Sequence, residues 1–114
     1  MKFLFSLFTS FFVILFVFIS SVFSEEMIVD LDLGEQIFSQ NCVSCHAGGN
    51  NLLNSDKTLS LTDLNRFGRD NMLGIIKQVT NGGNGMPVFG ERLSEEEILN
   101  VASYVLNQAK TDSW

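Results

Sequence analysis

The chain has 114 residues with 13 acidic and seven basic side chains, which gives a net charge of −6 at pH 7. This length favours a single domain, and the acidic balance argues against nucleic acid or an anionic lipid surface as a partner. Only two cysteines are present, Cys42 and Cys45. A disulfide between residues this close would close a very short loop and stabilise little of the fold, so their role is expected to be chemical.

The first 24 residues are organised like a secretory signal peptide. Lys2 precedes an apolar run that reaches Ile19, and small residues up to Ser24 lead into an acidic pair. This order is typical of export signals, so we expect removal of residues 1–24 and a mature domain of residues 25–114, whose net charge is −7. The alternative is an uncleaved anchor, because the run approaches the ~20 residues that span a bilayer.

The mature part has helical periodicity and no strand alternation. A first helix is expected to begin at Asp32, with Gly34, Ile37 and Phe38 facing inward. The Gly-, Asn- and Asp-rich residues 47–59 predict a loop.

Three further helices are expected after that loop. A short helix is predicted over residues 62–67, and another over residues 71–80, capped by Asp70 and ended at Gly82. The last helix begins at Ser94 with a capping box. Its apolar stripe consists of Ile98, Val101, Ala102, Val105 and Ala109.

The sequence Cys42-Val43-Ser44-Cys45-His46 carries the most specific signal. Cys-x-x-Cys-His is the attachment motif of c-type haem. Two thiols three residues apart can form thioethers to the two porphyrin vinyl groups, and the following histidine can ligate the iron. His46 is also the only histidine of the chain.

This motif has three alternative interpretations. A thioredoxin-like redox pair requires a βαβ context, which the pattern lacks. A zinc site requires four ligands, and the two cysteines with His46 supply three. Chance proximity of inert residues is the remaining alternative.

A second axial iron ligand is expected at Met86. Met1 leaves with the signal, Met27 lies near the new N-terminus, and Met72 has the helical spacing of a core residue. Met86 follows a Gly/Asn-rich loop that can wrap closely over a flat cofactor, and a thioether ligand raises the reduction potential. An ordinary buried methionine is the alternative.

Residues 29–114 resemble the cytochrome c6 family, the lumenal photosynthetic carriers of cyanobacteria and algae. The resemblance lies in the Ala-Gly-Gly-Asn-Asn extension after His46, in the loop from Asn81 through Met86-Pro87-Val88-Phe89-Gly90, and in the terminal Trp114. It implies the all-α class I cytochrome c fold, with four to five helices around one covalently bound haem c.

The resemblance further implies a soluble one-electron carrier that is not an enzyme. It would take electrons from the cytochrome b6f complex and pass them to photosystem I in the thylakoid lumen of an algal plastid or a cyanobacterium. Gln78 would lie near the haem, Arg92 would assist docking to photosystem I, and the mature protein would be a monomer or weak oligomer outside the membrane.

Two other functions are alternatives to a photosynthetic carrier. A respiratory carrier that donates to a terminal oxidase would share the same domain and compartment. A haem peroxidase would need an open iron site with acid/base groups, whereas Met86 would close that site and no second histidine exists.

Overall fold

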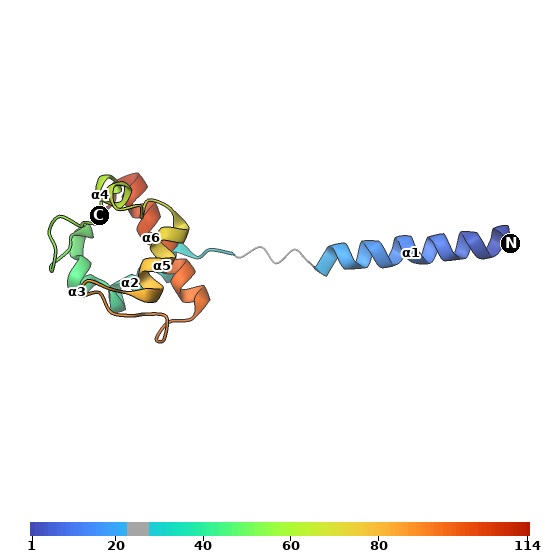
Figure 1. Cartoon of the computed structure of the whole chain (residues 1–114), viewed down its shortest axis with the longest axis horizontal. Helices are drawn as coiled ribbons and strands as arrows, with labels where there is room; N and C mark the ends of the chain where they lie inside the picture. The colour runs from blue at the N-terminus through green and yellow to red at the C-terminus, as the bar shows by residue number, and fades with distance from the viewer. Residues whose placement is uncertain (23–27) are drawn as a thin grey trace.

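The structure, a computed structural model, describes residues 1–22 and 28–114, and within these ranges it contains helices and no β-strand (Figure 1). The helices are α1 (Lys2–Val22), α2 (Leu31–Asn41), α3 (Val43–His46), the 3₁₀ turn η1 (Ala47–Gly49), α4 (Leu61–Arg66), α5 (Met72–Asn81) and α6 (Glu95–Thr111). The expected all-α fold is confirmed, and α2 to α6 are the five α-helices of residues 28–114.

Helix α1 stands apart from the group formed by α2 to α6 (Figure 1). Its apolar side chains from Phe3 to Phe18 are all exposed. Among the residues whose side chains are described, no helix is both long enough and apolar enough to cross a membrane. The expected cleavage site after Ser24 lies outside the described residues.

The main packing contact of the domain is the crossing of α2 over α6. Gly34 makes this contact possible, because a Cβ atom there would lie 2.2 Å from the backbone oxygen of Asn100. The predicted inward residues of α2 are buried, and so is the whole predicted stripe of α6. These buried faces meet in one apolar core that also includes Ile75 and Val79 of α5.

The predicted start of α2 and the predicted cap of α5 were wrong, and both corrections have a local cause. Helix α2 is capped by Asp30, whose Oδ1 accepts the N–H of Leu33 at 3.0 Å, so Asp32 lies inside the first turn. Helix α5 is capped by Asn71 rather than Asp70, since Asn71 Oδ1 accepts the N–H of Gly74 at 2.8 Å. An N-cap residue stands immediately before the first helical residue. Sequence spacing alone did not show which of the neighbouring candidate residues holds that position.

The remaining elements lie close to their predicted positions. Helix α4 begins one residue earlier than expected, and the expected loop of residues 47–59 starts with the η1 turn. The capping box at Ser94 is confirmed, because Ser94 and Glu97 exchange side chain-to-backbone hydrogen bonds. Met72 packs against the core, with the Ser103 hydroxyl 3.6 Å from its sulfur.

Candidate haem site

The two cysteines and the histidine lie on one helical turn that follows α2. The amide nitrogens of Cys45 and His46 both donate to the Cys42 carbonyl, at 3.2 and 2.9 Å. Residues three apart in a helix share a face, so this turn brings the two side chains together. Both thiols are free, and burial raises the pKa of the Cys42 thiol to about 11, which keeps it neutral near pH 7.

The imidazole of His46 is oriented by a backbone carbonyl. Its Nδ1 lies 2.9 Å from the carbonyl oxygen of Asn50. A carbonyl only accepts hydrogen bonds, so Nδ1 carries a proton, and in the neutral ring Nε2 then keeps its lone pair. Such a contact fixes both the tautomer and the ring direction of a metal-binding histidine.

The turn after His46 packs against the side chain of Trp114. A Cβ atom on Gly49 would lie 2.5 Å from the indole ring of Trp114. The indole N–H donates to the Leu59 carbonyl at 3.1 Å, and the Leu59 amide donates to the Gly49 carbonyl at 2.7 Å. Phe38 packs against Trp114 with ring centroids 5.4 Å apart, which ties this assembly to α2.

Met86 is presented by a tight turn after α5. Gly83 and Met86 exchange two backbone hydrogen bonds, of 2.9 and 3.0 Å. The residues between them, Asn84 and Gly85, both have positive φ, a conformation that glycine and asparagine tolerate best. Beyond the turn, the backbone amide of Phe89 donates to the Val79 carbonyl at 3.1 Å. The segment that carries Met86 therefore continues from α5 at one end and is hydrogen-bonded to α5 at the other.

One cavity of about 290 Å³ is lined by Cys42, Cys45, His46 and Met86 together. Its walls include the apolar side chains of Phe38, Leu64, Ile75, Val79, Val101 and Val105. Lys57, Arg69 and Gln78 contribute polar groups. The volume lies near the lower end of the range for ligand pockets. The structure therefore brings all four sequence-predicted site residues to one largely apolar space.

These donors fit haem c. They comprise two free thiols on one turn, an imidazole nitrogen with its lone pair free and a thioether on a separate loop. Within the described part of the chain, no group of three or more His, Cys, Asp or Glu side chains could hold a metal ion by itself.

The side-chain amide of Gln78 contacts the Met86 thioether. Its Nε2 lies 3.8 Å from the Met86 sulfur and donates to the Gly82 carbonyl at 3.2 Å. Its Oε1 accepts from Arg69 Nε at 3.2 Å. Sequence reasoning missed Arg69, because it lies nine residues before Gln78 in the connection between α4 and α5 and carries no local signal.

Arg92 lies outside the cavity, on the exposed turn before α6. The amide of Arg92 donates to the Phe89 carbonyl at 3.0 Å, and its guanidinium carbon lies 5.9 Å from the centre of the Phe89 ring. The side chain is solvent-exposed and could therefore contact another protein.

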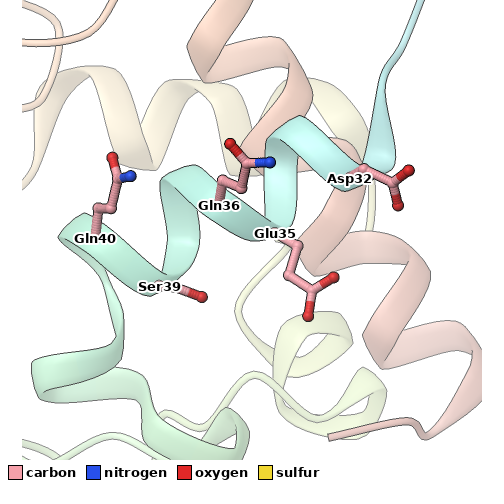
Figure 2. Close-up of a pocket in the computed structure, with 5 residues that line it drawn as sticks. All are labelled: Asp32, Glu35, Gln36, Ser39 and Gln40. Carbon is pink, nitrogen blue, oxygen red and sulfur yellow. The ribbon is translucent and has the colours of Figure 1, made fainter.

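A second depression lies on the exposed face of α2. Figure 2 shows its five polar side chains, which all come from this one helix and point in different directions rather than into a shared space. They are Asp32, Glu35, Gln36, Ser39 and Gln40. This arrangement offers no converging set of ligands.

Comparison with known proteins assigns the family. Residues 29–105 match the family model described as "Cytochrome C oxidase, cbb3-type, subunit III". Cytochrome c6 of Gracilaria tenuistipitata var. liui is 48% identical over 101 residues, covering 89% of this chain and 93% of the relative. Cytochrome c6 of Nostoc sp. is 53% identical over 79 residues, covering 69% of this chain and 71% of the relative.

A solved structure agrees with these relatives. The crystal structure of cytochrome c6 from the diatom Phaeodactylum tricornutum is 51% identical and superposes with a TM-score of 0.70, covering 72% of this chain and 97% of that one. The chain therefore carries the c-type cytochrome domain of the matching family model and belongs to the cytochrome c6 family.

Proposed function

We propose that this c-type electron carrier holds one covalent haem through Cys42 and Cys45, with His46 and Met86 as the two axial iron ligands. The observation that carries the proposal is the single cavity lined by all four side chains. The haem would supply a reversible one-electron iron couple. Asn50 holds the imidazole in the iron-binding tautomer, and the apolar walls exclude water, which disfavours the more highly charged ferric state.

Ligation by Met86 is tested with a matched pair of methionine variants. Met86→Ala is expected to lose the sulfur-to-iron charge-transfer band of the oxidised protein and to lower the reduction potential. Met72→Ala removes a methionine that packs against the core, and it is expected to keep both properties at some loss of stability. An unchanged band in Met86→Ala would refute the assignment.

The electron-transfer partners are proposed to be the cytochrome b6f complex as donor and photosystem I as acceptor, in the thylakoid lumen of an algal plastid or a cyanobacterium. The relatives named cytochrome c6 in red algae, cyanobacteria and diatoms support this assignment. Arg92 is the proposed docking residue, because it is exposed and cationic on a chain whose net charge is negative.

Flash-induced re-reduction of oxidised photosystem I tests this assignment. The holo-protein is expected to re-reduce photosystem I in a concentration-dependent way, with a rate that varies with salt because charges steer the encounter. Arg92→Gln is expected to slow the reaction more than Arg66→Gln, which removes an equal charge from exposed α4.

A respiratory role is the second candidate function. The family model that matches residues 29–105 is described as a cbb3-type oxidase subunit, which favours electron delivery to a terminal oxidase. A holo-protein that leaves photosystem I oxidised but supports oxygen consumption by an isolated terminal oxidase would favour this second candidate.

Residues 1–24 are proposed to be a signal peptide that is removed, leaving a soluble mature domain of residues 25–114. The exposed apolar side chains of α1 support this, since such a surface in water favours aggregation. N-terminal sequencing of the protein recovered from its compartment is expected to begin at Glu25. A sequence that begins at Met1 would indicate a retained anchor.

A further inference from the structure

The amide of Gln78 has only one orientation compatible with its neighbours. Arg69 Nε lies 3.2 Å from one end of the amide, and a guanidinium has hydrogen-bond donors but no acceptor. The atom that faces Arg69 must therefore be Oε1. The nitrogen end then faces the Gly82 carbonyl at 3.2 Å and the Met86 sulfur at 3.8 Å, both of which are acceptors.

Arg69 is itself held firmly by its surroundings. Its guanidinium also donates to the Phe67 carbonyl at 2.9 Å, and its amide donates to the Leu64 carbonyl at 2.7 Å. The start of α5 packs directly on this backbone, because a Cβ atom on Gly74 would lie 3.2 Å from the Arg69 Cα. The donor that reaches Gln78 is thus fixed at both its backbone and its tip.

We propose that Arg69 is a positioning residue that holds the Gln78 N–H toward the Met86 sulfur and thereby raises the reduction potential of the haem. The inference rests on the proposed ligation by Met86. An N–H group directed at the sulfur engages a lone pair and presents its positive end to the iron ligand. Both effects oppose the extra positive charge of the ferric state. Without Arg69, the amide can rotate or leave the sulfur.

A purely electrostatic action of Arg69 is the competing explanation. Arg69 lines the cavity, so its positive charge alone would also disfavour ferric iron. A double-mutant cycle separates the two effects, because an action through Gln78 disappears when Gln78 is absent, whereas a direct charge effect persists.

The experiment measures the reduction potential of the purified holo-protein and of Arg69→Met, Gln78→Leu and the double variant. Arg69→Met is expected to lower the equilibrium constant for reduction about tenfold, which is about 59 mV for one electron. In the Gln78→Leu background the same substitution is expected to lower it by about threefold or less, the part due to charge alone. Equal effects in both backgrounds would overturn the inference.

Two further variants control for charge. Arg66→Met removes an exposed cation of α4 and is expected to leave the potential almost unchanged. Arg69→Lys keeps the positive charge but places a methylene group where Nε stands, so it is expected to lower the equilibrium constant for reduction by about threefold or more, the part of the Arg69→Met effect that does not come from charge. A wild-type potential in Arg69→Lys would show that charge alone suffices and would overturn the inference.

Spectroscopy on the same samples separates failure of the inference from failure of the proposed ligation. If wild-type oxidised protein lacks the sulfur-to-iron charge-transfer band, Met86 ligation has failed and the inference with it. If the band is present but the cycle is additive, only the role of Arg69 has failed. In the reduced protein, the two proton NMR signals of the Gln78 side-chain amide are expected to be shifted from the free-amide positions and to move toward those positions in Arg69→Met.

Discussion

Replacing Gly34 with alanine should test the contact on which the crossing of α2 and α6 depends. A Cβ atom there would lie 2.2 Å from the backbone oxygen of Asn100 and 2.9 Å from the Cβ of Tyr104. Ordinary contact begins near 3.4 Å, so the two helix backbones would have to separate by about 1.2 Å. Backbone atoms cannot rotate away as a side chain can, so the helices themselves must move.

The energetic effect follows from that separation. Overpacking of this kind destabilises by about 3 kcal/mol, and alanine recovers about 1 kcal/mol through its higher helix propensity. The net loss of about 2 kcal/mol should lower the Tm of a domain of this size by roughly 8–16 °C. The loss of contacts extends to the neighbouring buried residues Phe38 and Val101, because dispersion weakens steeply with small gaps.

The assay is thermal and denaturant unfolding of the holo-protein, followed by circular dichroism. Ser39→Ala provides the control, because Ser39 lies on the exposed face of the same helix (Figure 2) and its replacement is expected to be neutral or slightly stabilising. If Gly34→Ala unfolded at the same temperature as the parent or higher, the close crossing of α2 and α6 would be refuted.

Substitutions at three other positions probe the supports of the fold and the site. Trp114→Ala should cost about 3 kcal/mol of unfolding free energy, whereas Trp114→Phe, which loses mainly the bond from the indole N–H to Leu59, should cost about 1 kcal/mol; an unchanged unfolding free energy in Trp114→Phe would contradict the role of that bond. Ser94→Ala removes the cap of α6 and should cost about 1 kcal/mol, and an unchanged denaturation midpoint would argue against the capping box. The pKa of Asp63 is lowered mainly by the hydrogen bond from the Thr58 hydroxyl. The Thr58 backbone amide and the positive charge of Arg66 lower this pKa further by smaller amounts. The stability this adds is present above the pKa of the unfolded chain and is lost as pH falls through the lower folded value. Asp63→Asn should therefore flatten the fall of Tm with acidification, and an equally steep fall would contradict the assignment.

The sequence alone determined those features whose physical cause lies within one or two helical turns. The three-residue spacing of Cys42 and Cys45 predicts that both thiols lie on one face of a helical turn, and the two residues do form such a turn. The capping box at Ser94 and the stripe of α6 were also predicted correctly. The N-terminal caps of α2 and α5 were not predicted correctly. Asp30 and Asp32 lie two positions apart, Asp70 and Asn71 are adjacent, and each of these residue types can cap a helix.

Tertiary structure decided which distant residues support the site. Met86 could be proposed by elimination, but only the fold brings it into one cavity with His46. The contacts of Gly34 with Asn100, of Gly49 with Trp114 and of Arg69 with Gln78 join different segments. Such contacts depend on the crossing of helices and the path of loops, so no local pattern in the sequence encodes them.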